Sequence, residues 1–152
     1  MHVLHAAKKY QLPSLVQQCT DYLDKELKAS NACSILDHSR FFNEDALIKK
    51  CLDNIERNTV EALSSEDFLK VSDETLALIL ESEKIGAMDE VKIFERCYQR
   101  AVNKADGKQS PRDVLGENLF KIRFPVMPIQ EFTDIVCPTH VLSMEEQLAI
   151  FK

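Results

Sequence analysis

The side chains of this chain best suited to chemistry are those of its five cysteines and four histidines. Cysteine and histidine pairs at short spacing would hold a tetrahedral zinc ion, and a thiol beside an imidazole could serve as a nucleophile with its base. No Cys-x-x-Cys or His-x-x-x-His pair occurs. The cysteines are also odd in number and widely spaced, which argues against a disulfide framework and favours a reducing compartment. These residues are Cys19, Cys33, Cys51, Cys97, Cys137, His2, His5, His38 and His140.

A thiol hydrolase is the enzyme that these residues would suggest, with Cys51 or Cys97 as the nucleophile. Both cysteines lie on apolar helical stripes, whereas a catalytic thiolate needs an exposed, electropositive setting. Three acidic pairs could instead act as acid–base couples, but neighbouring residues on a helix point about 100° apart. Because each pair lies at a predicted helix start, where negative charge suits the helix dipole, we interpret all three as caps. The pairs are Glu44-Asp45, Glu66-Asp67 and Glu145-Glu146.

Composition excludes several other classes of function. The net charge is −6 with no basic patch, which argues against nucleic acid as a ligand. No apolar run approaches the roughly 20 residues of a membrane span, and the start of the chain lacks a secretory pattern. Three glycines leave no phosphate-binding loop. We therefore expect a cytoplasmic protein of 152 residues in one core, with no catalytic residue, cofactor or metal.

Two amphipathic helices and their connector, residues 31–58, are the clearest element of the chain. Asn43 is able to cap a helix start, and an apolar stripe follows it at three- and four-residue steps. That stripe comprises Leu47, Ile48, Cys51, Leu52 and Ile55. The preceding segment offers a matching face of Ala32, Ile35, Leu36 and Ser39. The short connector at Phe42-Asn43 then predicts an antiparallel hairpin.

The remaining segments also follow helical periods, and none alternates as a strand would. We expect helices over residues 2–11, 13–27, 73–86, 88–103, 114–122, 128–136 and 143–151, with short turns near 60–63 and 66–69. The polar stretch 104–112 is expected to be a mobile loop. Arg123 lies in an apolar run, and we expect it to donate hydrogen bonds to carbonyl groups. The predicted fold is all-α, a helical bundle of about eight to ten helices in antiparallel pairs.

The order of these motifs resembles a known family. Residues 3–28 resemble the last two helices of a BTB (POZ) domain, and Ser30 to Lys152 resembles a BACK domain, so we divide the chain into 1–28 and 29–152. The most specific parts are Ser30-Asn31-Ala32-Cys33, Ser65-Glu66-Asp67-Phe68-Leu69, Val91-x-x-Phe94 and Ile122-Arg123-Phe124-Pro125-Val126-Met127. The last of these resembles BTB–BACK proteins that carry a PHR domain more than Kelch proteins. Residues 1–152 include neither the strands of a BTB domain nor a PHR or Kelch domain, so the resemblance implies a fragment of an adaptor, and Tyr98-Gln99 stands where relatives often carry a tryptophan.

The resemblance implies a non-catalytic scaffold segment of a substrate adaptor for a cullin-3 ubiquitin ligase. In such proteins cullin-3 binds the BTB core and the helix pair after it, here residues 31–58, called the three-box. The family pattern also implies an unknown substrate protein, a role in positioning the substrate-binding domain, and dimerisation only through the BTB core. The candidate cullin interface is Tyr10, Leu12, Ser34, His38, Phe41 and Asn43. The alternative is a self-standing helical protein–protein interaction domain unrelated to cullin.

Phe41 distinguishes two interpretations of the hairpin. At about 100° per residue, Phe41 lies opposite the predicted core face and beside Ser34 and Asp37. An aromatic ring there either packs against the helix that begins at Pro13 or lines a groove for cullin. We favour packing, because interior helices of a bundle have two buried sides.

Overall fold

The structure, a computed structural model, describes the backbone of residues 1–152 and every side chain except those of Gly86 and Ala87. Every regular element in this range is helical, which confirms the all-α prediction. The α-helices are α1 (His2–Lys9), α2 (Pro13–Glu26), α3 (Ala32–Phe41), α4 (Asp45–Arg57), α5 (Thr59–Ser64), α6 (Asp73–Leu80), α7 (Glu90–Ala105), α8 (Pro111–Leu115), α9 (Ile129–Glu131) and α10 (Met144–Ile150). Shorter helical turns are η1 (Phe68–Lys70), η2 (Glu83–Ala87), η3 (Gly116–Lys121), η4 (Phe124–Val126), η5 (Phe132–Val136) and η6 (Cys137–Thr139).

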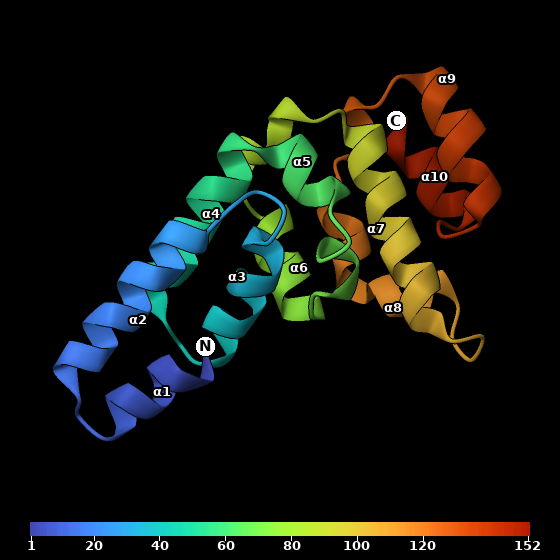
Figure 1. The fold of residues 1–152 in the computed structure, drawn as a ribbon. Coiled ribbons are helices and arrows are strands. Elements are labelled where there is room, and N and C mark those ends of the chain that lie inside the picture. The colour runs from blue at the N-terminus through green and yellow to red at the C-terminus, as the bar shows by residue number, and fades with distance from the viewer.

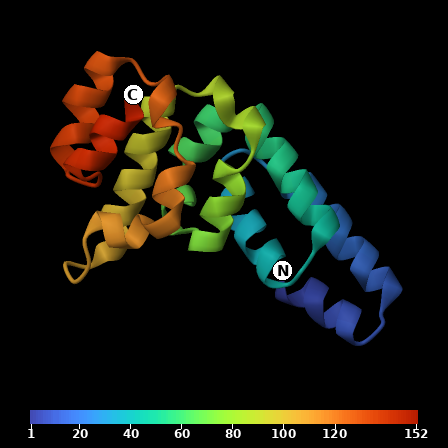
Figure 2. The same ribbon diagram turned by 180° about the vertical axis from the view of Figure 1, so that it is seen from behind.

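The molecule is elongated, with the hairpin of α1 and α2 at one end and α8 to α10 at the other (Figure 1). The view from behind shows the same separation of the two ends, with α3 to α7 between them (Figure 2). Within α2 no side chain is fully buried, and the apolar residues of α1 and α2 border an open groove. The residues that line it include Val3, Leu4, Leu15, Cys19, Tyr22 and Leu23. Of the residues that α2 contributes to this groove, Tyr22 is exposed and Leu15, Cys19 and Leu23 are half-buried, so this side of α2 is only partly covered.

Helices α3 and α4 pack against each other more extensively than any other pair of elements in the described chain. α4 buries Leu47, Cys51 and Ile55, while Ile48 and Leu52 are half-buried at the edge of the same stripe. α3 buries Ala32, Cys33, Leu36 and Ser39. The two apolar faces expected from periodicity therefore meet, because each helix can remove its stripe from water only against the other.

The prediction that Asn43 caps α4 is wrong. Asn43 adopts a left-handed conformation with φ of 54°, and its backbone N–H donates to the carbonyl of Arg40. The next N–H, that of Glu44, donates to the carbonyl of Ser39 at 2.8 Å. This pair of bonds is a Schellman motif, which ends a helix. Asparagine tolerates left-handed angles, so Asn43 terminates α3 and leaves Glu44 to precede α4.

Helix α7 forms the centre of the second half of the molecule. It buries Val91, Phe94, Cys97 and Ala101, and it packs against α8, η1, α5 and η5. An aromatic column continues from this helix, with ring centroids 4.9 to 6.0 Å apart. It joins Tyr98, Phe94, Phe124, Phe132 and Phe151 in that order. The first pair is stacked and the other three are edge-to-face, and these contacts connect the C-terminal turns to the core.

Several predicted boundaries differ from the structure. The expected loop 104–112 is shorter, because α7 continues to Ala105 and α8 begins at Pro111, where Ser110 and Asp113 form a capping box. The expected helix 114–122 is divided into α8 and η3. Gly116 has φ of 50° between them, a conformation that favours glycine and interrupts an α-helix. The expected helix 128–136 is a short α-turn followed by a π-helical turn.

Candidate functional site

Phe41 is exposed, so the favoured packing interpretation is wrong. Its relative exposure is 76%, and its ring meets that of Phe42 edge-on at 5.1 Å. Adjacent residues of a helix point about 100° apart, so only one ring of this doublet can face α1. Phe42 takes that place, with its ring 5.4 Å from His2 and 4.7 Å from His5. Phe41 is thereby left at the surface, at the end of α3.

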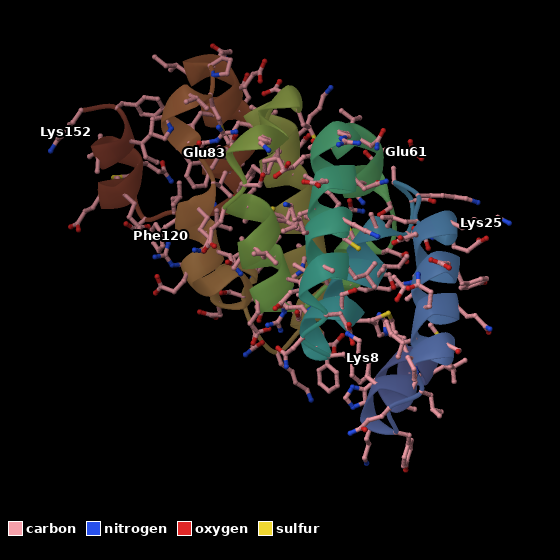
Figure 3. The ribbon with its side chains drawn as sticks, turned by 90° about the vertical axis from the view of Figure 1, so that its left-hand side faces the viewer. Lys8, Lys25, Glu61, Glu83, Phe120 and Lys152 are labelled. Atoms are coloured by element: carbon pink, nitrogen blue, oxygen red, sulfur yellow. The ribbon has the colours of Figure 1, made fainter. Side chains whose placement is uncertain are left out.

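Lys8 and Glu44 complete the joint between the α1–α2 hairpin and the α3–α4 hairpin. The ammonium of Lys8 pairs with the carboxylate of Glu44, whose side chain is only 7% exposed. Figure 3 places Lys8 where the first hairpin meets the start of α4. Lys50 and Asp24 form a second ion pair between α4 and α2. Glu44 was expected to be a cap, but its side chain makes no cap bond and serves instead as a buried partner of Lys8.

Tyr10 and Leu12 lie in the turn between α1 and α2, with relative exposures of 68% and 48%. α1 ends in the same motif as α3, because Gln11 is left-handed with φ of 53°. The N–H of Leu12 donates to the carbonyl of Ala7, and that of Gln11 to the carbonyl of Lys8. Tyr10 and Leu12 are exposed at the end of α1, and Phe41 and Asn43 are exposed at the end of α3.

Ser34 and His38 occupy one side of α3, one turn apart. His38 is exposed, and its Nδ1 lies 2.8 Å from the carbonyl oxygen of Ser34, which is half-buried. Phe41 follows His38 by three residues, so the two share a face of the helix. The structure thus groups Ser34, His38 and Phe41 on α3, while the contacts to α1 are made by their neighbour Phe42 and by Glu44. Such a mixed apolar and polar surface is suited to binding a protein.

The sequence interpretation did not identify Phe42, Lys8 or the pairing of Glu44. Of these, only Phe42 had a signal in the sequence. It follows Phe41 at a helix end, where one ring must face inward if the other faces water. The ion pair of Lys8 with Glu44 joins residues 36 positions apart in the chain, and no local pattern marks such a pair.

Three of the five cysteines are in settings that disfavour a thiolate. Cys33, Cys51 and Cys97 are fully buried, and burial raises the pKa of each of these thiols to about 12. Cys19 and Cys137 are half-buried. Within the described residues no group of three or more His, Cys, Asp or Glu side chains is arranged to hold a metal ion.

The hydrogen-bond partners of the arginine side chains differ from those expected from the sequence. Arg123 was expected to donate to carbonyl groups, but its side chain is 47% exposed and pairs with Glu90, Nη2 lying 2.8 Å from the carboxylate. Glu90 also accepts the backbone N–H of Arg123, so this ion pair anchors the segment that precedes η4. Arginines that do donate to backbone carbonyl oxygens are Arg96, Arg112 and the fully buried Arg100, none of which sequence analysis singled out.

The acidic pairs have separate roles. Glu146 forms a capping box with Ser143, as its interpretation as a cap predicts, whereas Asp67 precedes only the short turn η1 and makes no side-chain cap bond. The hydrogen bonds from Arg112 hold the pKa of Glu146 at about 2. In the part of the chain that the structure describes, no helix is both long and apolar enough to cross a membrane.

Comparison with known proteins gives consistent matches. The model of the family described as BACK, BTB And C-terminal Kelch, matches residues 32–137. BTB/POZ domain-containing protein 6 of Homo sapiens is 34% identical over 154 residues, which cover 97% of this chain and 28% of that protein. BTB/POZ domain-containing protein 3 of Homo sapiens is also 34% identical over 154 residues, covering 97% of this chain and 29% of that protein. The chain therefore spans less than a third of the length of these relatives.

Proposed function

The chain belongs to the BACK family, and from this membership we propose that it is a non-catalytic scaffold segment of a BTB–BACK adaptor for a cullin-3 ubiquitin ligase. In this role it helps to bind cullin-3 and to position a substrate-binding domain, in the cytoplasm. Residues 1–28 contribute the last helices of a BTB domain and residues 29–152 the BACK domain. The sequence of residues 122–127 supports a PHR-type adaptor in particular.

The observation that carries this proposal is the exposure of Phe41 beside the joint between the two hairpins. A phenylalanine that is 76% exposed at the end of a well-packed helix adds little to the stability of the fold. Partially exposed aromatic side chains are the usual anchors of protein interfaces, where burial in a partner's pocket supplies most of the affinity. Phe41 shares a face of α3 with His38, and we propose that this face binds the N-terminal region of cullin-3, with Tyr10 and Leu12, exposed in the turn between α1 and α2, as further contacts.

The open groove between α1 and α2 gives separate support to the BTB assignment. Its lining is mostly apolar, and Tyr22 on its edge is 65% exposed. An amphipathic helix whose apolar side faces water is unfavourable unless another element covers it. We propose that the remainder of a BTB domain covers this groove, and that dimerisation occurs only through that remainder.

The substitution Phe41→Glu tests the cullin proposal in the chain itself. We expect binding to the N-terminal region of cullin-3, measured by calorimetry or by NMR titration, to weaken at least tenfold, about 1.4 kcal/mol. The melting temperature should change by only a few degrees, because Phe41 loses little more than its edge contact with Phe42.

Two controls make this result specific. Val60→Glu also places a carboxylate on an exposed apolar position, at 56% exposure on α5, and should leave binding unchanged. Leu36→Glu buries a charge in the α3–α4 core, where Leu36 is fully buried, and should unfold the hairpin. If the wild-type chain binds cullin-3 and Phe41→Glu binds equally well, the proposed surface is wrong. If neither the wild-type chain nor that chain extended by a BTB core binds, the cullin proposal gives way to a helical interaction domain with another partner.

A further inference from the structure

The core-facing side of α3 consists mainly of small side chains. Of its buried residues, Ala32, Cys33 and Ser39 are small, and only Leu36 is large. Packing of side-chain ridges into grooves favours a crossing angle for α3 and α4, but it carries no directional bond. A directional contact on another side of α3 would further restrict the rotation of α3 about its own axis and so fix the orientation of its exposed side.

Asp37 makes that directional contact. One carboxylate oxygen of Asp37 accepts three hydrogen bonds from the start of α6. The donors are the backbone N–H of Ser72 at 3.1 Å, the hydroxyl of Ser72 at 2.6 Å and the hydroxyl of Thr75 at 2.5 Å. Ser72 is itself the N-cap of α6, so Asp37 holds the residue that begins that helix. Hydrogen bonds to an ionised acceptor are the strong, geometrically demanding kind.

Arg40, one turn further along α3, makes a second contact with α6. Its Nε donates to the hydroxyl of Thr75 at 3.2 Å, and its Nη2 lies 3.4 Å from the carboxylate of Glu74. The burial of Asp37 by itself would raise the pKa of its carboxyl, but the hydrogen bonds from Ser72 and Thr75 outweigh burial and hold that pKa below its ordinary value. The contact is therefore made by a carboxylate at neutral pH, near the positive end of the α6 dipole.

Asp37 shares a face of α3 with the candidate interface. Phe41 follows it by four residues, Ser34 precedes it by three, and His38 is its neighbour. Residues three and four apart lie one above the other on a helix. Any rotation of α3 that broke the contacts of Asp37 would move Phe41 and His38 by the same angle.

We propose that Asp37, by holding the start of α6, is a positioning residue that fixes the orientation of Phe41 and His38 for a protein partner. This inference rests on the proposed function for the identity of the partner, but not for the existence of the contact. It assigns to α6, which carries none of the candidate interface residues, a part in the affinity of that interface.

The first experiment tests the contact without any partner. Hydrogen exchange of the isolated chain should show at least tenfold faster exchange of the Ser72 amide and of the last turn of α3 in Asp37→Ala. Asp37→Asn keeps a carbonyl oxygen that can accept from Ser72 and Thr75, so it should recover part of the protection. If exchange in Asp37→Ala equals that of the wild type, the carboxylate does not hold α3 and the inference is wrong.

The second experiment separates positioning from direct contact with the partner. Ser72→Ala removes a donor to Asp37 from the α6 side and leaves every residue of α3 unchanged. We expect it to weaken binding of the cullin-3 N-terminal region about threefold to tenfold, in proportion to the faster exchange. Arg112→Gln, which loosens α10 at the opposite end of the molecule (Figure 1), serves as a control for general destabilisation and should bind normally.

The outcomes distinguish this inference from the proposed function. Weaker binding with Ser72→Ala and normal binding with Arg112→Gln support positioning by Asp37. Normal binding with Ser72→Ala, together with lost binding in Asp37→Ala, would make Asp37 a direct contact and overturn the inference. Absence of binding both in the wild-type chain and in that chain extended by a BTB core refutes the cullin proposal, and the exchange experiment then decides the role of Asp37 alone.

Discussion

The substitution Arg100→Ala tests how the two halves of the molecule are held together. Arg100 lies on α7 and is fully buried. Its Nε and Nη2 donate to the carbonyl oxygen of Val71 at 3.1 and 2.7 Å, and Nη2 also donates to Asp73 at 2.7 Å. Val71 and Asp73 flank Ser72, the N-cap of α6, so this one side chain holds α7 against the segment between η1 and α6. Its removal should loosen the contact of α7 with that segment.

The size of the effect follows from what each contact loses. A hydrogen bond from a charged donor contributes about 1.5–3 kcal/mol when its acceptor is buried. The carbonyl of Val71 keeps a partner in Lys104, at 2.6 Å, and Asp73 is 62% exposed and returns to water, so only part of that sum is lost. Each buried methylene of the arginine stem adds about 0.8 kcal/mol. We expect Arg100→Ala to cost about 3–4 kcal/mol of unfolding free energy, or a fall in melting temperature of about 6–16 °C.

Arg100→Met is the matched variant, since it refills most of the volume without a charge. It removes the contacts to Val71 and Asp73, but it also removes the cost of burying a guanidinium whose Nη1 has no partner among the described residues. We expect it to cost about 1–2 kcal/mol, clearly less than the alanine variant. Urea unfolding followed by far-ultraviolet circular dichroism measures both. Two results would contradict this expectation: a loss of under about 1 kcal/mol of unfolding free energy in Arg100→Ala, or an equal loss in Arg100→Met and Arg100→Ala.

Lys104 gives a second readout of the same substitution. Its pKa is lowered by burial and then by the neighbouring charge of Arg100. Removing that charge in Arg100→Met should raise the pKa of Lys104, which an NMR titration of the ammonium group detects. A pKa that is unchanged or lower would show that Arg100 does not act on Lys104.

Two further predictions concern charge and thiol chemistry. The pKa of Glu146, ordinarily 4.5, is held at about 2 by Arg112, so its stabilising contribution is present above pH 4.5 and lost as the pH falls through about 2. The difference in melting temperature between wild type and Arg112→Gln should therefore shrink as the pH falls through this window, and a constant difference would contradict it. A thiol-alkylating reagent should modify the half-buried Cys19 and Cys137 in the native chain, and the three buried thiols only on unfolding. Peptide mass spectrometry measures this, and rapid modification of Cys33, Cys51 or Cys97 would refute it.

Local sequence determined most of the helices and several of their ends. The stripe of Leu47, Cys51 and Ile55 predicts both the helix and its buried side, since a helix must remove such a stripe from water. The caps Ser72 and Ser143 are also local, because each hydroxyl accepts from an N–H only three residues away. Interactions of this range depend only on residues that are neighbours in the sequence, and so they can be inferred without knowledge of the fold.

Tertiary structure alone decided which side chains the fold covers and which it leaves exposed. The sequence shows two rings at Phe41 and Phe42, but the position of α1 selects the one that is covered. It likewise shows arginines at 100 and 123, but only the packing of α7 buries the first and leaves the second at the surface. The partners that make these choices lie about 30 or more positions away, and their approach depends on the packing of whole helices. No periodicity within one segment carries that information.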